Sequence, residues 1–96
     1  MGRSDILAVL RVYKETMGER YGITALGIFG SFARDTATDD SDVDVCVCMP
    51  DPDPFKLVHL KEHLEQSLKR HVDIVRIRDV MNPVLKQRIE RDAIYV

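Results

Sequence analysis

The sequence predicts an α+β fold, in which a small mixed β-sheet is packed with helices. Apolar residues recur at helical spacing in three segments, and short apolar or alternating runs bounded by glycine and proline separate them. Helix-type and strand-type segments also alternate along the chain. At 96 residues the chain is long enough for one hydrophobic core, so we expect a single domain over residues 1–96.

The first half predicts helix, strand, short helical turn and strand. Ser4 or Asp5 is expected to cap a helix that Gly22 ends, with a core stripe of Ile6, Leu10, Tyr13 and Met17. The apolar run 24–29 lies between glycines and predicts a buried strand. Residues 31–34 suit the first turn of a short helix, and the polar residues 35–41 form a loop. Residues 42–48 alternate with a period of two, which indicates a second strand.

The second half continues the alternation after the proline-rich loop 49–54. Asp53 is expected to cap a helix with Pro54 at its first position and a core stripe of Leu57, Leu60, Leu64 and Leu68. Residues 71–77 alternate and predict a third strand. Asn82-Pro83 opens a last helix whose inward residues are Leu85 and Ile89, and residues 93–96 suit a short terminal strand.

Composition excludes several classes of protein. With 45% hydrophobic and 31% charged residues, the chain is too apolar for intrinsic disorder. A net charge of -2 provides no basic field, so nucleic acid is not expected as a direct partner. No apolar run reaches membrane-spanning length and no secretion signal is evident, so we expect no membrane association and a cytoplasmic location. The cysteines, Cys46 and Cys48, are interpreted as small buried apolar side chains.

Asp42 and Asp44 are the most informative residues. Residues two apart on a strand point the same way, so both carboxylates share one face while Val43, Val45 and Val47 enter the core. Two such carboxylates repel each other unless a cation lies between them, and hard oxygen ligands suit Mg²⁺. An isolated Asp-x-Asp is more often an exposed polar turn. An EF-hand calcium loop is excluded, because Val45 stands where that loop requires glycine.

Two further elements fit phosphate chemistry. Gly30 and Ser31 follow a buried strand and precede a helical turn, where glycine permits close approach of the backbone and amides bind anions. Asp73 lies in an apolar strand, where a charge is costly unless it is paired or bound to metal. Alone, the first is more often a simple turn, and the second is equally consistent with an edge-strand aspartate facing water. If the strand of Asp73 neighbours that of Asp42 and Asp44, three carboxylates converge, as two-metal phosphoryl transfer requires.

Together these residues resemble the DNA polymerase β nucleotidyltransferase superfamily. The resemblance rests on Gly30-Ser31-Phe32-Ala33-Arg34, the polar loop, Ser41-Asp42-Val43-Asp44-Val45 and the later strand aspartate. It is greatest for the minimal nucleotidyltransferases, the antitoxins of HEPN/MNT toxin–antitoxin pairs, and covers nearly the whole chain. One departure is Asp35, at a position where the family often has glycine, and it adds a negative charge near the expected triphosphate.

The resemblance implies a polymerase β-like palm fold and a role for each site residue. Asp42 and Asp44 would hold two Mg²⁺ ions, and Asp73 would complete the metal site on the acceptor side and help remove the hydroxyl proton. Gly30 and Ser31 would hold the β- and γ-phosphates of ATP. Arg34 would either contact phosphate or brace the loop.

The resemblance also implies a partner. The chain has no room for an acceptor-binding domain, so a cognate HEPN ribonuclease toxin is expected to supply the acceptor hydroxyl. The expected reaction is transfer of AMP from ATP to this hydroxyl, and the expected acceptor residue is a tyrosine. The alternative is a non-catalytic antitoxin that neutralises the toxin by complex formation. Transfer to a small molecule is a third and less favoured reading. The remaining basic residues are interpreted as a solvated face, of which a subset could contact a partner; they are Arg76, Arg78, Lys86, Arg88 and Arg91. No role is assigned to His59, His63 and His71.

Overall fold

A mixed sheet of four strands forms the centre of the protein. The computed structural model describes residues 1–96, and its strands are β1 (Ala25–Phe29), β2 (Val43–Cys48), β3 (Val72–Arg76) and β4 (Ile94–Tyr95). Their order in the sheet is β3-β2-β1-β4. β1 runs antiparallel to both β2 and β4, whereas β2 and β3 are parallel. The expected α+β class is confirmed, and β3 lies at the edge of the sheet.

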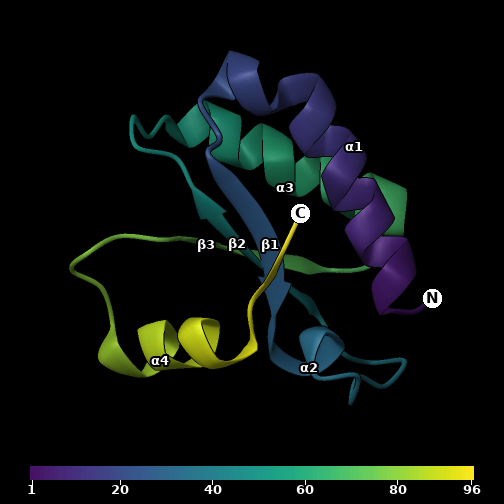
Figure 1. Ribbon diagram of the computed structural model, residues 1–96. Coiled ribbons are helices and arrows are strands. Elements are labelled where there is room, and N and C mark those ends of the chain that lie inside the picture. The colour runs from purple at the N-terminus through teal and green to yellow at the C-terminus, as the bar shows by residue number, and fades with distance from the viewer.

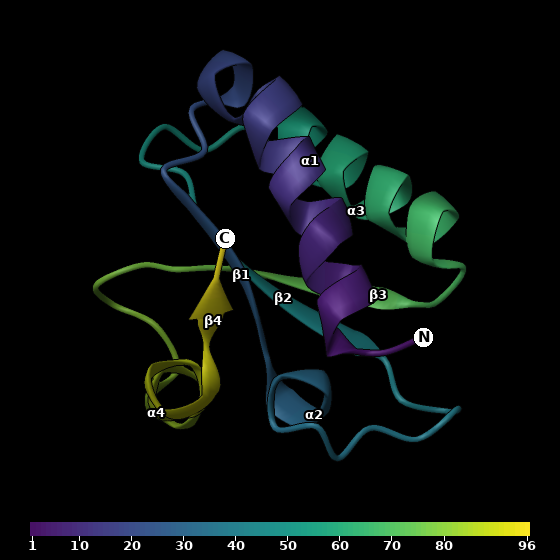
Figure 2. The same ribbon diagram turned by 45° about the vertical axis from the view of Figure 1, so that its right-hand side comes forward.

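Helices cover both faces of this sheet. The helices are α1 (Arg3–Tyr21), α2 (Gly30–Ala33), α3 (Pro54–Leu68) and α4 (Pro83–Asp92). α1 and α3 lie side by side over one face, and α4 lies against the other (Figures 1 and 2). α2 is a single turn that follows β1 directly and contacts β2. No helix combines the length and the apolar character that a membrane span requires.

Two hydrophobic clusters hold the layers together. The larger lies between the sheet and the α1–α3 pair and contains the three β2 valines together with Leu60, Leu64 and Leu68. The smaller lies under α4 and contains Phe29, Cys46 and Ile89. Alternation along β2 therefore sends odd-numbered residues to the first cluster and even-numbered residues to the α4 face.

The cysteine interpretation holds for one of the two residues. Cys46 is fully buried, whereas Cys48 is partly exposed. Burial raises the pKa of the Cys46 thiol to about 11, so this side chain stays protonated and behaves as an apolar residue at neutral pH.

Helix ends agree with the sequence at three positions and differ at one. The Asp53 side chain accepts a hydrogen bond from Phe55 N at 2.9 Å, with Pro54 at the first helical position. Asn82 accepts from Val84 N and Leu85 N. Gly22 ends α1 in the left-handed conformation. The expected cap at Ser4 or Asp5 is wrong, because Gly2 is the N-cap and the Asp5 carboxylate accepts from its N–H at 2.9 Å.

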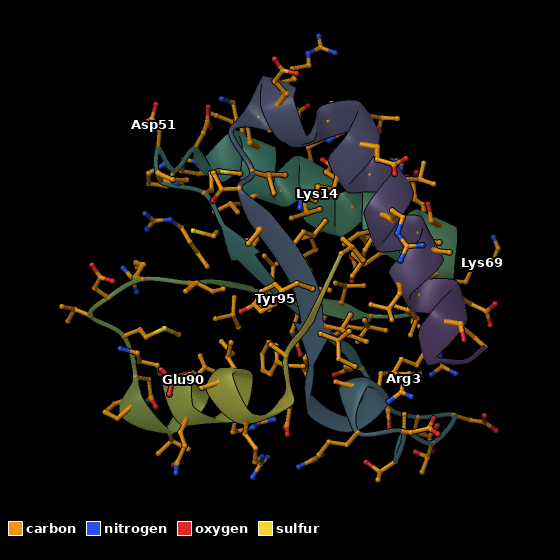
Figure 3. The ribbon with its side chains drawn as sticks, in the orientation of Figure 1. Arg3, Lys14, Asp51, Lys69, Glu90 and Tyr95 are labelled. Carbon is orange, nitrogen blue, oxygen red and sulfur yellow. The ribbon has the colours of Figure 1, made fainter.

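Side-chain contacts tie α1 to distant parts of the chain. The Arg3 guanidinium donates to the carbonyl oxygen of Ala33 at 2.8 Å, which connects α1 to the end of α2. Lys14 Nζ donates to the carbonyl oxygen of Val96 at 2.9 Å and so holds the terminal residue beside α1 (Figure 3). The first contact helps to position the short helix that borders the candidate site.

Candidate active site

Neighbouring strands β2 and β3 place four polar residues in two rows. Asp44 is the register partner of Asp73, and Val43 N donates to the carbonyl oxygen of His71 at 3.0 Å, which places Asp42 beside His71. Because residues two apart on a strand face the same way, all four side chains lie on the α4 face of the sheet. Carboxylate oxygens of Asp42 and Asp73 and a ring nitrogen of His71 all lie within 4.8 Å of one another.

Asp44 is the partly buried member of this group, while the other three are exposed. Burial is the main cause that raises the pKa of Asp44, and repulsion from the carboxylates of Asp73 and Asp42 raises it further. Arg88 and Arg34 lower the pKa of Asp44 and partly offset these effects. A divalent cation bound here would offset the repulsion among the three carboxylates and favour the charged form of Asp44.

The donor set fits a hard divalent ion. Three carboxylates contribute oxygen ligands, and their exposed side leaves room for water and phosphate oxygens, as Mg²⁺ coordination requires. Asp73 had been equally consistent with a solvent-facing edge residue, and its side chain is 50% exposed on the edge strand. The register nevertheless brings it directly beside Asp44.

The sequence analysis assigned no role to His71, but the structure places its ring among the side chains that could bind a metal ion together with Asp42 and Asp73. Its Nε2 lies 3.1 Å from Asp73 Oδ1, and its Nδ1 lies 3.0 Å from Glu65 Oε2. Glu65 also accepts a hydrogen bond from Val72 N at 3.0 Å, which anchors α3 to the start of β3. The available signal was the spacing of two residues between His71 and Asp73 on a predicted strand. His59 and His63 instead pack against Tyr13 between α1 and α3.

Gly30 allows the β1–α2 turn to lie directly against the Asp44 carboxylate. Its backbone is left-handed, with φ of 73°, and it is buried. A β-carbon at this position would collide with Asp44 Oδ2, so a larger residue would displace this carboxylate in addition to straining the left-handed backbone. Ser31, the next residue of α2, is partly exposed. Of the predicted glycine–serine pair, Gly30 therefore borders Asp44, and the nucleotide-binding role of Ser31 stays a prediction.

Arg34 bridges the turn and the last helix. Its side chain is 46% exposed, and its Nη1 lies 3.8 Å from Asp92 Oδ2, whose side chain is only 4% exposed at the end of α4. Asp92 also accepts two hydrogen bonds from Arg91. Arg34 thus braces the α2 segment against α4 and still presents charge toward Asp44. This contact supports bracing, one of the two roles left open by the sequence, and the contact with phosphate stays a prediction.

Asp35 follows with a left-handed backbone, at φ of 62°. Its N–H donates to the carbonyl oxygen of Phe32 at 3.2 Å, and Thr36 N donates to that of Ser31 at 2.9 Å. A left-handed residue at this point explains why glycine suits the position. Aspartate is among the few other residues that adopt this conformation readily, so it supports the same turn.

Arg88 was assigned to a solvated face, but in the structure it also lies close to Phe29 and affects the charge of Asp44. Its guanidinium lies 5.9 Å from the centroid of the Phe29 ring, and it helps to lower the pKa of Asp44. Phe29 is the register partner of Asp44 in β1 and immediately precedes Gly30. Two arginines from different elements, Arg34 and Arg88, therefore provide positive charge at the side of the site where α2 meets α4.

Comparison with known proteins gives consistent matches. A family model described as a nucleotidyltransferase domain matches residues 10–96. Protein adenylyltransferase MntA of Thermococcus cleftensis is 34% identical over 93 residues, which cover 96% of this chain and 93% of the relative. MJ0128 of Methanocaldococcus jannaschii, provisionally named a protein adenylyltransferase, is 38% identical over 94 residues, covering 97% of this chain and 96% of the relative.

Solved structures agree with the fold. A protein provisionally described as a minimal nucleotidyltransferase matches with a TM-score of 0.80 and 32% identity, covering 98% of this chain and 95% of that chain. A complex of the tri-AMPylated HEPN toxin of Shewanella oneidensis with its MNT antitoxin matches with a TM-score of 0.61 and 22% identity, over 97% of this chain and 66% of that chain. The second similarity concerns the fold alone.

Proposed function

The chain belongs to the nucleotidyltransferase domain family, and from that premise we propose that it transfers AMP from ATP to a tyrosine hydroxyl of a cognate HEPN toxin, with Mg²⁺. In this role it acts as the antitoxin. The observation that carries the proposal is the placement of Asp42, Asp44 and Asp73 on adjacent strands, next to the left-handed Gly30.

The metal-binding residues in this proposal are the three aspartates. Asp42 and Asp44 hold two Mg²⁺ ions, and Asp73 completes the acceptor-side set. When bound, the ions supply positive charge that stabilises the entering and leaving oxygens of the transferred phosphoryl group. Asp44 is half-buried and is repelled by the carboxylates of both Asp73 and Asp42, so it is the carboxylate for which we propose sharing between the ions.

In this proposal the nucleotide-binding residues come from α2 and from Arg34, which caps its end. Gly30 and Ser31 offer backbone N–H groups and a hydroxyl at the start of α2, and a glycine there lets phosphate oxygens approach the main chain. Arg34, fixed by Asp92, provides charge for the β- and γ-phosphates.

The acceptor side is formed by β3. The tyrosine oxygen attacks the α-phosphorus, a new phosphorus–oxygen bond forms, and the bond to pyrophosphate breaks. The Asp73 carboxylate accepts the hydroxyl proton as the attack proceeds. The product is an AMP–tyrosine phosphodiester on the toxin and free pyrophosphate. The added negative charge and bulk would then keep RNA from the toxin.

Support for a protein acceptor comes from the relatives. A relative that matches nearly full length is named protein adenylyltransferase MntA, and a structural neighbour contains an AMPylated HEPN toxin with its MNT antitoxin. In the present chain the site is formed by side chains close to the surface, so a large acceptor can approach it.

The test is a mass measurement on the partner. A candidate HEPN partner is incubated with this chain, ATP and Mg²⁺, and intact-mass and peptide spectra are recorded. We expect a mass increase of one or more AMP groups on tyrosine, and none with the Asp44→Asn variant. A stable complex that blocks the toxin without any mass increase would replace this proposal with the non-catalytic antitoxin.

A further inference from the structure

The outer side of β3 has backbone groups that face away from the sheet. Val43 N donates to the His71 carbonyl and Ile77 N donates to the Val47 carbonyl, so odd-numbered residues of this segment bond to β2. The intervening residues therefore direct their N–H and C=O groups outward. Val72 N is already used by Glu65, which leaves the groups of Ile74 and Arg76 at the open edge.

A groove follows this edge between α3 and α4. One cavity of about 460 Å³ is lined on one side by the start of α3 and on the other by the start of α4, with Leu57, Val75, Met81 and Leu85 among its apolar walls. A second cavity of about 350 Å³ continues along α3 and shares three lining residues with the first, namely Leu57, Ile74 and Arg76. A strand added to β3 would meet apolar side chains on both of its faces.

Exposed hydrophobic residues are frequent in the segments that supply the lining of the groove, and one of them, Val58, lines it directly. Seven large hydrophobic residues are exposed in the whole chain, and four of them come from the segments that border the groove: Phe55, Val58, Val80 and Val84. Phe55 is 86% exposed and Val80 is 88% exposed. Such a concentration is typical of a surface that a partner covers.

The charges of the groove are positive although the chain is acidic overall. Lys61, Arg76 and Arg78 line it, and Asp73 is the one acidic lining residue, which gives a local balance of +2 against -2 for the chain. The Arg76 side chain is held by a 3.1 Å hydrogen bond from its Nε to the carbonyl oxygen of Met49. Pairing of β3 with β3 of a second copy would bring two such positive sets together, so charge disfavours a second copy as the occupant.

We propose that this groove binds an extended segment of the acceptor protein, with an apolar centre and acidic flanks, which pairs with β3 as an additional strand. The identity of the acceptor rests on the proposed function. Main-chain pairing at Ile74 and Arg76 supplies affinity, the apolar walls bury alternate side chains, and the basic residues select the acidic flanks. β3 is five residues long, which corresponds to roughly 17 Å of strand.

This docking mode also places the acceptor near the chemistry. Asp73 lies on the docking strand itself, next to Ile74. A residue opposite Asp73 on an added strand has its β-carbon about 4.5–5.5 Å from that of Asp73 and its side chain on the same face of the sheet. Segments that continue from the added strand therefore pass the acceptor side of the site.

The experiment uses a peptide that lacks any hydroxyl, so that binding is measured without AMP transfer. The probe is acetyl-Glu-Glu-Val-Ile-Val-Ile-Val-Glu-Glu-amide, titrated into ¹⁵N-labelled protein at low ionic strength and without nucleotide. One control peptide has lysine in place of every glutamate. A second control is N-methylated at two adjacent central residues, which face opposite edges, so that neither edge can pair.

We expect saturable shifts of the Ile74 and Arg76 amides with the acidic peptide. Both control peptides should bind at least tenfold more weakly. Arg78→Glu should weaken the acidic peptide at least fivefold, whereas Arg11→Glu, an exposed substitution on α1, should leave its affinity unchanged. Failure of AMP transfer would not affect these measurements, so the two proposals fail separately.

Three outcomes would overturn the inference. Shifts confined to other surfaces, or none, would show that the edge does not pair. Equal affinity for the acidic and the lysine peptides would exclude an acidic occupant. Shifts of the Ile74 and Arg76 amides on raising the protein concentration alone would assign the edge to a second copy of the chain.

Discussion

Gly30→Ala tests whether the close approach of the β1–α2 turn to Asp44 is required for nucleotide and metal binding. The new β-carbon enters a left-handed residue and collides with the Asp44 carboxylate. The backbone cost of the left-handed conformation is about 1–2 kcal/mol for a residue with a β-carbon. In a domain of this size that cost corresponds to a fall in melting temperature of about 4–16 °C.

Gly22→Ala is a matched control for the backbone cost. Gly22 has nearly the same φ, 69° against 73° for Gly30, and a β-carbon there meets nothing within 4 Å. Both variants should therefore lose stability of the same order, but only Gly30→Ala forces the Asp44 side chain to move. Displacement of this carboxylate should weaken joint binding of ATP and Mg²⁺ at least tenfold, because position and charge of the shared ligand change together.

The assay combines thermal unfolding with calorimetric titration of ATP in the presence of Mg²⁺. Gly22→Ala should bind with wild-type affinity once folded, and Gly30→Ala should not. If folded Gly30→Ala bound ATP and Mg²⁺ as tightly as Gly22→Ala, the contact between the turn and Asp44 would have no role in the site, and the placement of the triphosphate beside Gly30 would be wrong.

Three further predictions follow from the same geometry. Asp44→Asn should abolish AMP transfer and, in chelator at pH 7, raise the melting temperature, because the raised pKa of Asp44 means that its charge destabilises the folded state. This gain in melting temperature should shrink as the pH falls through the pKa of Asp44. Equal gains at pH 7 and pH 4 would contradict the prediction. Asp73→Asn should lower the transfer rate roughly 10²–10⁴-fold with little change in ATP affinity, and calorimetry beside partner mass spectrometry separates the two effects. ATP and Mg²⁺ together should raise the melting temperature far more than either alone, by the equivalent of about 2.7 kcal/mol at a hundred times the dissociation constant, and equal stabilisation by ATP in excess chelator would exclude the carboxylate site.

Much of the fold was predictable because each element has a local signal. Alternation placed β2 correctly within one residue, and Asp53-Pro54 and Asn82-Pro83 mark the starts of α3 and α4 through capping chemistry that needs no tertiary context. The start of α1 was misplaced because Ser4 and Asp5 are good caps in isolation. In the structure Asp5 accepts from the Gly2 N–H from inside the helix.

The site was only partly predictable, because its halves come from separate elements. The shared face of Asp42 and Asp44 follows from strand geometry alone, but the position of Asp73 beside Asp44 depends on strand order and on the parallel register of β2 and β3. Nothing local to the sequence specifies that order. Arg88 was missed for the same reason, because its contact with Phe29 joins α4 to β1. His71 had a local signal in its spacing of two residues from Asp73, but its contact with Glu65 depends on how α3 packs beside β3.

The position of Asp73 on an edge strand connects the two proposals. A carboxylate on a central strand has paired strands on both sides, so it has no free backbone edge beside it. Here the acceptor-side carboxylate lies on the outermost strand, half exposed, with an unpaired backbone edge and apolar walls beside it. A small acceptor would have few groups with which to use that edge, whereas an extended protein segment can use all of it. The strand that carries Asp73, the carboxylate proposed to accept the proton, is therefore also the strand on which we expect a protein acceptor to bind.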